Sequence, residues 1–292
     1  MDTISTLQIY GSTPGFHHGV DLQAPAGTKV YAPVGGTIAV GYYYPRYRTP
    51  YTYMVSITAK DGYRWELHHV DPDSIPQSVR DLAASGGTAP QGMQLAAIYD
   101  ASALGIPPHL HVDVIDPQGV YHNGLAFFPA LADDRPPTIR GVYFVDAASR
   151  AAAAGRLQGQ GVDVPAGKYD LVIDAADEIP PGTWGDSLYA LEVVAAERPV
   201  GSMRFDRLPD KDYLKGVDAV YRLAPFTGPS GETIANQIEL DRPRHFLFHF
   251  PFDTAALPPG ATRVPLEVRA VDFAGNETRL TLELRLQPRA FP

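Results

Sequence analysis

Three clusters of histidines in the first part of the chain have the spacing of metal ligands. Six of the nine histidines fall into the groups His17-His18, His68-His69 and His109-x-His111. The chain has no cysteine, so any transition metal must be held by histidine, aspartate or glutamate. One histidine alone is usually a structural residue. Three clusters within one stretch indicate a metal site.

Two of the clusters predict how the ligands converge. His17 and Asp21 enclose Gly19 in the pattern His-x-Gly-x-Asp. A glycine at this position lets the backbone bend, so that the imidazole and the carboxylate reach one cation. His109 and His111 stand two residues apart in PPHLHVDV. On a strand they project from the same face, where one binds a metal and its neighbour holds a water or a substrate oxygen.

Such a ligand set suits hydrolysis. Two imidazoles and one carboxylate leave one position of tetrahedral zinc open. At that position zinc lowers the pKa of water toward about 7 and polarises a scissile carbonyl. Neighbouring histidines take up the proton, steady the oxyanion and pass the proton to the leaving amine. The residues therefore predict a metal-dependent hydrolase that uses activated water.

The third cluster, WELHHV (65–70), leaves two candidates open. If this segment is one regular strand, Trp65, Leu67 and His69 share one face and Glu66 and His68 share the other. Only one of the two histidines then faces the metal cleft. We favour His69, because it shares the apolar face, and keep His68 as the alternative.

Short apolar runs separated by turns predict a mainly β protein. Gly (27) and Pro (28) are frequent. Residues 53–59 and 63–70 flank Lys60-Asp61-Gly62, which predicts a hairpin. Residues 75–84 predict the one short helix, which ends before Gly86. Further strands are expected at 28–40, 95–99 and 109–115.

The chain divides into two expected domains. The polar, proline-rich segment ALADDRPP (130–137) is typical of a linker. We therefore predict a first domain at 1–134 and a second at 135–292. Alternating apolar segments continue through the second half and predict a β-sandwich accessory domain.

The motifs HHGVD, PAGTKVYAPVGGTIAV, the strand that ends in HHV, and PPHLHVDV resemble the lysostaphin-type (LytM-like) zinc endopeptidases of peptidoglycan. The resemblance covers roughly residues 8–128. It implies an antiparallel β-sheet metallopeptidase domain that holds one Zn²⁺ per chain through His17, Asp21 and His111. It implies His69 and His109 as the catalytic histidines beside the metal. The segment AVDFAGNETRLTLEL likewise resembles the final hairpin of an immunoglobulin-like module.

The resemblance also implies a function and a place. The expected reaction is hydrolysis of a peptide bond in bacterial peptidoglycan, in a cross-bridge or a stem peptide. The expected location is outside the cytoplasm: the cell envelope, the periplasm or the medium. Residues 1–15 lack the basic start and apolar core of a signal peptide, so we expect no such leader in this chain.

The sequence departs from the family pattern at three points. Leu67 and Val70 replace the tyrosine and leucine that normally surround the strand histidine. Val112 and Asp113 replace the aromatic residue and glutamate that normally follow HLH, at positions expected to support the ligands. The segment 45–52 replaces a shorter turn, which leaves the preferred substrate open.

Other functions remain as alternatives. A catalytically inactive relative would keep the fold and act as a scaffold or an activator of cell-wall hydrolases. The segment PAGTKVYAPVGGTIAV also resembles biotinyl and lipoyl carriers, whose modified lysine would be Lys60 at its hairpin tip. Neither alternative explains three histidine clusters with all the ligands in place.

Charge and hydropathy exclude other partners. The net charge is −9 and no basic stripe exists, which argues against nucleic acid and anionic lipid. No apolar run reaches the length of about 20 residues that a membrane helix needs, so no membrane insertion is expected. The second domain carries no recognisable chemistry. The sequence leaves open whether it holds the cell wall, a partner protein or the catalytic groove.

Overall fold

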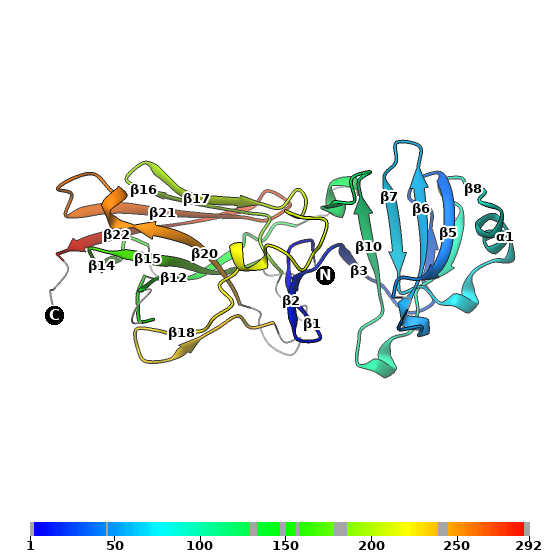
Figure 1. The fold of residues 1–292 in the computed structure, drawn as a ribbon, viewed down its shortest axis with the longest axis horizontal. Helices are drawn as coiled ribbons and strands as arrows, with labels where there is room; N and C mark the ends of the chain where they lie inside the picture. The colour runs from blue at the N-terminus through cyan, green and yellow to red at the C-terminus, as the bar shows by residue number, and fades with distance from the viewer. Residues whose placement is uncertain are drawn as a thin grey trace. The chain divides into compact units, whose positions relative to one another are not determined.

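The computed structural model describes residues 3–44, 46–128, 133–146, 150–155, 158–177, 186–238 and 245–288. The protein is mainly β, as the sequence predicts. It forms two compact units (Figure 1). Unit 1 contains residues 1–4, 17–128 and 207–213, and unit 2 contains residues 5–16, 129–206 and 214–292.

The boundary between the units falls at 128/129 in place of the predicted 134/135, and two short segments belong to the unit of the other half. Residues 5–16 belong to unit 2, where Thr6 donates a hydrogen bond to Asp186 and Tyr221 donates one to the carbonyl of Ser5. Residues 207–213 belong to unit 1, where Leu208 is buried and its backbone N–H donates to the carbonyl of Tyr121 at 2.9 Å. Residues 130–132 of the expected linker lie outside the described residues. Whether the chain folds in two halves stays a prediction.

Unit 1 contains nine strands, one α-helix and four 3₁₀ turns within its described residues. The strands are β3 (Val20–Gln23), β4 (Lys29–Tyr31), β5 (Gly36–Tyr42), β6 (Tyr53–Ala59), β7 (Arg64–His68), β8 (Thr88–Ala89), β9 (Gln94–Ala97), β10 (His109–Ile115) and β11 (Tyr121–His122). The helices are η1 (Pro50–Thr52), η2 (Pro72–Ser74), α1 (Gln77–Ser85), η3 (Ser102–Leu104) and η4 (Gly124–Phe127).

Strand β10 pairs with three other strands of the unit 1 sheet. The sheet runs β11-β10-β7-β6-β5-β8, and β3 pairs with β10 as well. One edge of β10 pairs with β7, while its other edge pairs first with β3 and then with β11. The antiparallel partners of β10 therefore bring segments from the start and the middle of unit 1 alongside it.

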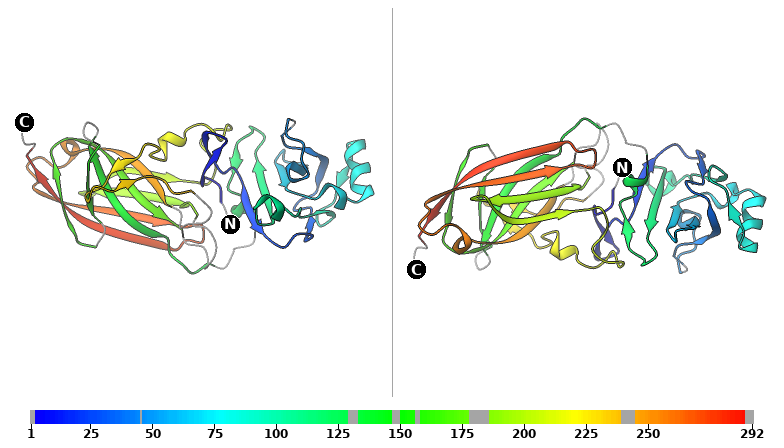
Figure 2. Two further views of the ribbon diagram at one scale, coloured as in Figure 1. Left: turned by 90° about the horizontal axis from the view of Figure 1, so that it is seen from below. Right: turned by 90° about the horizontal axis from the view of Figure 1, so that it is seen from above.

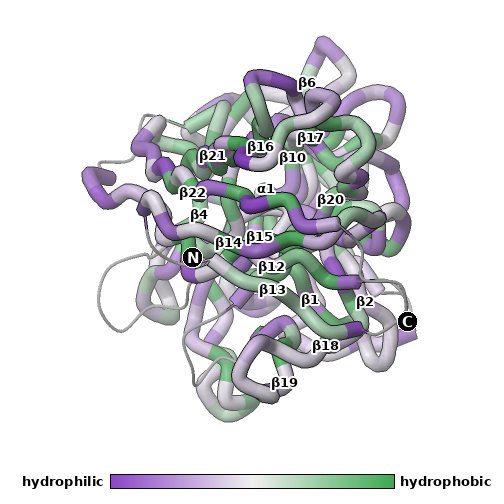
Figure 3. The backbone as a smooth tube through the Cα atoms, turned by 90° about the vertical axis from the view of Figure 1, so that its left-hand side faces the viewer, coloured by the Kyte–Doolittle hydropathy of each residue, from purple (hydrophilic) through white to green (hydrophobic). Residues whose placement is uncertain are grey.

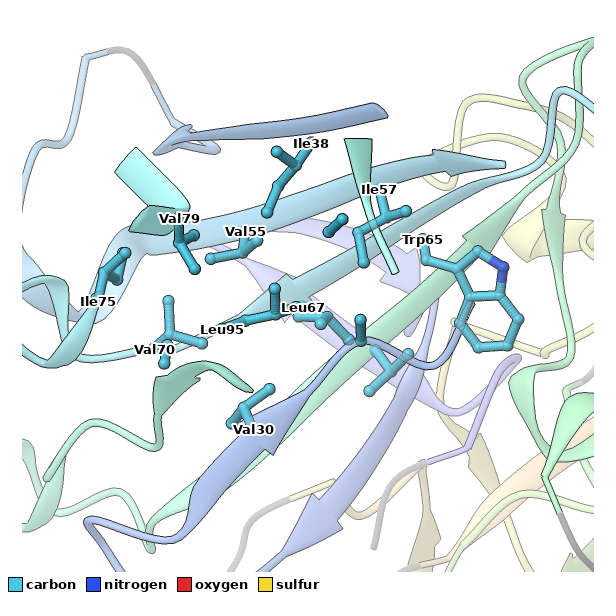
Figure 4. Packing of buried hydrophobic residues seen from close by; sticks show 14 of the residues in the cluster. Val30, Ile38, Val55, Ile57, Trp65, Leu67, Val70, Ile75, Val79 and Leu95 are labelled. Atoms are coloured by element: carbon cyan, nitrogen blue, oxygen red, sulfur yellow. The ribbon is translucent and has the colours of Figure 1, made fainter. Parts of the chain in front are cut away.

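The core of unit 1 lies against one face of this sheet (Figure 4). Along β10, Val112 and Val114 belong to this core, whereas His109, His111 and Asp113 occupy the alternate positions. Along β7, Trp65 and Leu67 belong to it. Because the side chains of a strand alternate between faces, burying these apolar residues presents the polar ones on the opposite face.

The predicted local elements are confirmed. Strands β6 and β7 pair as the hairpin around Gly62, whose φ of +86° suits a tight turn without a side chain. Helix α1 occupies the predicted segment and ends at Gly86, which adopts the left-handed conformation at φ +66°. The strand predicted at 109–115 is β10.

In the part of unit 2 that the structure describes, there are two larger sheets and two small hairpins. Its strands are β1 (Leu7–Tyr10), β2 (Thr13–Phe16), β12 (Thr138–Asp146), β13 (Ala152–Gly155), β14 (Gly161–Pro165), β15 (Lys168–Ala176), β16 (Ala190–Ala195), β17 (Arg198–Arg204), β18 (Phe226–Thr227), β19 (Thr233–Ile234), β20 (Phe246–Asp253), β21 (Arg263–Val271) and β22 (Glu277–Gln287). Its 3₁₀ turns are η5 (Val217–Ala219) and η6 (Thr254–Ala256).

The two larger sheets of unit 2 pack as layers. One has the order β13-β12-β15-β20 and the other β14-β22-β21-β16-β17. Gly201 of β17 lies so close to the ring of Phe250 on β20 that an added Cβ would overlap it, so the sheets touch there. Buried and more exposed residues alternate along β21 and β22, as half-buried strands require, and Figure 3 colours the chain by hydropathy. This arrangement agrees with the predicted sandwich.

The predicted final hairpin consists of β21 and β22, which run side by side over nine residue pairs (Figure 2). Its turn is closed by the Asp272 side chain, which accepts hydrogen bonds from the backbone N–H groups of Gly275 and Asn276. The described helices of the chain are all too short or too polar to span a bilayer.

A fragment of residues 1–134 tests the predicted independence of the first half. We expect it to fold and to bind zinc, because the ligands and the apolar core cluster of unit 1 lie within it. It lacks Leu208, whose burial contributes about 2 kcal/mol, so its melting temperature should fall below that of the intact chain. Zinc content and thermal unfolding measure both effects. An insoluble fragment would contradict the expectation.

Candidate metal centre

The three sequence-predicted zinc ligands converge in the structure. The register of β10 and β3 places His111 directly opposite Asp21, so both side chains project from the same face. His17, four residues before Asp21, approaches from the segment before β3. His111 Nδ1 lies 2.8 Å from Asp21 Oδ1 and 3.0 Å from His17 Nε2, and His17 Nε2 lies 3.2 Å from Asp21 Oδ1.

This triangle of donor atoms fits zinc. Bonds of 2.0–2.2 Å in a tetrahedron separate the donor atoms by about 3.4 Å. The three observed separations are slightly shorter, so a small outward movement of the side chains accommodates the ion. Three protein ligands leave the fourth position of a tetrahedron for solvent or substrate.

Hydrogen bonds fix which ring nitrogen of each ligand faces the metal. His17 Nδ1–H donates to the carbonyl of Thr3 at 3.1 Å, which leaves Nε2 to bind. His111 Nε2–H donates to Asp113 Oδ1 at 3.0 Å, which leaves Nδ1 to bind. Such partners orient metal-binding imidazoles and make them better ligands.

Charge in the ligand triangle also favours a cation. Burial alone would raise the pKa of Asp21, but His17 and His111 hold it well below its usual value. Burial alone would lower the pKa of His111, but Asp113 and Asp21 raise it to about 9. Asp21, which faces His111 Nδ1, favours a metal ion at that nitrogen, and Asp113 supports the imidazole from its Nε2 side.

Gly19 has a different role from the one expected from the sequence. It is absent from the glycines with positive φ, so the motif does not depend on a bend that only glycine can make. A Cβ at Gly19 would lie 2.5 Å from Asp113 Oδ1 and 2.7 Å from His111 Nε2. Glycine is required because the chain between His17 and Asp21 passes directly over β10.

The two histidines predicted to be catalytic lie together beside the ligands. The ring centroids of His69 and His109 are 4.8 Å apart, and His109 Nε2 lies 3.8 Å from Asp21 Oδ1. His109 Nδ1–H donates to the carbonyl of Pro107 at 2.8 Å, and His69 Nδ1–H donates to the carbonyl of Tyr51 at 2.8 Å. In both rings Nδ1 is the nitrogen that donates to the backbone, which leaves Nε2 to face the site.

The reason given from the sequence for choosing His69 is wrong. Strand β7 ends at His68, and His69 adopts the left-handed conformation at φ +60°. Strand alternation would have put His69 on the core face with Leu67. The left-handed residue instead turns the chain, so that both His68 and His69 reach the site side of the sheet. The expectation that only one of them could do so is therefore wrong as well.

His69 is held neutral and in place. Burial lowers its pKa well below the usual value, and the nearby His111 and His109 lower it further. The ring of Tyr51 stacks on it with centroids 3.9 Å apart and planes 8° apart. Tyr51 belongs to η1, within the segment that departs from the family pattern.

His68 belongs to a second group of side chains, arranged around Asp113. Asp113 is fully buried and accepts hydrogen bonds from His18 Nδ1–H at 2.8 Å, His111 Nε2–H at 3.0 Å and His68 Nε2–H at 2.9 Å. Burial alone would raise its pKa, but His18 and His111 hold it well below its usual value. Asp113 thus anchors the ligand His111, as its position after the HLH motif suggested.

Aromatic side chains surround the site, and one comes from far along the sequence. The ring of Tyr43 lies 4.6 Å from that of His68, and the ring of Tyr213 lies 4.6 Å from that of His18. The hydroxyls of Tyr44 and Tyr213 are 3.4 Å apart. Sequence analysis did not find Tyr213, because nothing local distinguishes it from a surface tyrosine.

The remaining histidines pair with carboxylates elsewhere. His122 Nε2 lies 3.0 Å from Asp116 Oδ2 in unit 1. His245 and His249 of unit 2 lie 3.0 Å from Asp174 and 2.7 Å from Asp170. None of these three contributes to the ligand triangle.

Residues 15–124 match the family model Peptidase family M23, which supports the resemblance seen in the motifs. No curated protein matches the chain. One similar solved structure is titled "Structure of the SpoIIQ-SpoIIIAH pore forming complex". It has 19% sequence identity and a TM-score of 0.30, over 42% of this chain and 72% of the other.

Proposed function

We propose that the M23-like part of this chain is a zinc-dependent endopeptidase that hydrolyses peptide bonds of bacterial peptidoglycan. The observation that carries the proposal is the ligand triangle of His17, Asp21 and His111, with donor atoms 2.8–3.2 Å apart and two further histidines beside it. In this proposal the protein works outside the cytoplasm, and unit 2 holds the wall or a partner.

Zinc, when bound, would supply a Lewis acid that acidifies water and polarises the scissile carbonyl. His69 is neutral and presents Nε2, so it accepts the proton of the attacking water. The protonated His69 then passes this proton to the leaving amine, while His109 Nε2, beside Asp21, accepts a hydrogen bond from the attacking water and orients it. Asp113 keeps His111 in the orientation that binding requires.

The competing proposal is an inactive scaffold or activator with the same fold. An inactive domain does not need a complete ligand set with each ring nitrogen oriented by a hydrogen bond. The full set, together with the pair His69 and His109, supports the enzyme. The reaction itself decides between the two proposals.

Digestion of defined peptidoglycan fragments tests the reaction. We expect new amino groups without new reducing sugar ends, and product masses that identify the peptide bond. A strong chelator should abolish the activity and added zinc should restore it. His122→Ala is the matched control, because it removes a unit 1 histidine outside the ligand triangle. Reducing ends would indicate a glycosidase, and no products from zinc-loaded protein on several wall types would favour the scaffold.

Activity should fall at acid pH because zinc is lost. Protons compete with the ion for His17 and His111, and the metal-free site favours the proton, since the pKa of His111 is about 9. The pKa of His69 lies well below 6.5, so this base stays neutral as the pH falls through 6.5. Between pH 8 and 5, activity and zinc content should therefore decline together. A loss of activity with full zinc content would assign the acid limb to a catalytic group.

A further inference from the structure

A second group of potential ligands adjoins the first on the same sheet face. The register of β10 and β7 places His68 opposite His111 and Glu66 opposite Asp113. All four side chains project from the face that carries the ligand triangle. The first site uses only His111 of this array. Glu66, His68 and Asp113 remain as a separate set, and each offers one ligand atom within 4.8 Å of the others.

Two donor-atom separations in this set resemble those of the first set. His68 Nε2 lies 2.9 Å from Asp113 Oδ2 and 3.3 Å from Glu66 Oε2. The exposed fractions of the side chains are 3% for His68, 0% for Asp113 and 12% for Glu66. Two carboxylates and one imidazole at these separations suit the bond lengths and geometry of zinc.

The charges of these side chains also favour a metal ion between them. Buried carboxylates are stable only when they are paired or bind a metal. Glu66 pairs with Arg64, whose Nε lies 2.8 Å from Oε1, and with His68, whose Nε2 lies 3.3 Å from Oε2. In the metal-free chain, His68 shares its Nε2 proton with the carboxylates of Glu66 and Asp113. A divalent cation at the same place would replace this proton and pair with both carboxylates.

We propose that Glu66, His68 and Asp113 form a second site for a divalent transition-metal ion such as Zn²⁺. The site adjoins the first through His111, whose Nδ1 faces the ligand triangle and whose Nε2 lies 3.0 Å from Asp113 Oδ1. It binds less tightly than the first, because the ion competes with Arg64 for Glu66 and displaces the proton that His68 donates to Asp113. The sequence predicted one zinc per chain, and this site adds a second.

Zinc counting on the intact chain tests the second site. The metal-free protein is dialysed against buffered free Zn²⁺ over a range of concentrations, and bound zinc is measured. We expect one tight equivalent and a second that binds at higher free zinc. His17→Ala should lose the tight equivalent and keep the second. Glu66→Gln should keep the tight equivalent and weaken the second at least tenfold.

His68→Asn provides an independent variant, should Glu66→Gln fold poorly. It should also keep one tight equivalent and lose the second. Asp81→Asn on α1 is the matched control, because this carboxylate lies in unit 1 outside both ligand sets, and it should bind two equivalents. A parent protein that saturates at one equivalent overturns the proposal, as does a second equivalent that persists in both Glu66→Gln and His68→Asn. The hydrogen bonds around Asp113 are then purely structural. Because only zinc is counted, neither result depends on peptidase activity.

Discussion

His111→Ala is expected to lose the tightly bound zinc and reduce peptidase activity to background. The substitution removes Nδ1, which lies within 3.0 Å of both other donor atoms. Loss of an outer partner of a ligand already costs roughly 10–100-fold in affinity, and loss of the ligand costs more. Metal analysis after exchange into weak-chelator buffer, with activity on the same sample, measures both effects.

The fold should survive this substitution. His111 lies on the site face of β10, while the neighbouring Val112 faces the apolar core. Circular dichroism and thermal unfolding check this point, and His122→Ala again serves as the control for removing a unit 1 histidine. Full retention of tight zinc by a folded His111→Ala protein would overturn the ligand assignment.

His69→Ala is expected to lose most activity while it keeps the tight zinc. Its ring lies beside the ligand triangle but contributes no atom to it. Removing a general base typically costs 10²–10⁴-fold in rate. His109→Ala should behave in the same way. Steady-state kinetics should show the loss in kcat, with tight zinc at the parent level.

His68→Ala is the discriminating control for this result. Asp113 keeps its hydrogen bonds from His18 and His111 when His68 is absent, so His111 stays oriented. We therefore expect activity within a few-fold of the parent. The reverse pattern, an active His69→Ala and an inactive His68→Ala, would assign the base to His68.

Together the two results separate metal binding from chemistry. A scaffold that merely binds zinc would show the zinc loss in His111→Ala but no activity in the parent chain. An enzyme shows activity that disappears in His69→Ala with zinc still bound. The parallel measurement of zinc and rate is what distinguishes the two proposals.

The sequence alone determined the local elements and the chemical type of the site. The hairpin at Gly62, the helix that ends at Gly86 and strand β10 depend on turn residues and on alternation within a few positions, which can be read locally. The absence of cysteine and the motif around His17 and Asp21 restricted the ligands to histidine and carboxylate.

Only the tertiary structure decided how these residues meet. The pairing of β3 with β10 sets Asp21 opposite His111, and the pairing of β7 with β10 sets Glu66 opposite Asp113. Register between strands that are distant in sequence depends on which faces the core buries, and no local pattern records it. Gly19 must be a glycine because the segment before β3 passes directly over Asp113 and His111 of β10.

The positions of His69 and Tyr213 depend on contacts that the periodicity of the sequence cannot predict. His69 reaches His109 because one residue leaves the strand conformation, whereas the alternation rule assumes a regular strand to the end. Tyr213 reaches His18 because residues 207–213 belong to unit 1 although they follow much of unit 2 in the chain. The left-handed conformation at His69 and the return of residues 207–213 to unit 1 both involve residues that are distant in sequence. Only the folded chain therefore determines them.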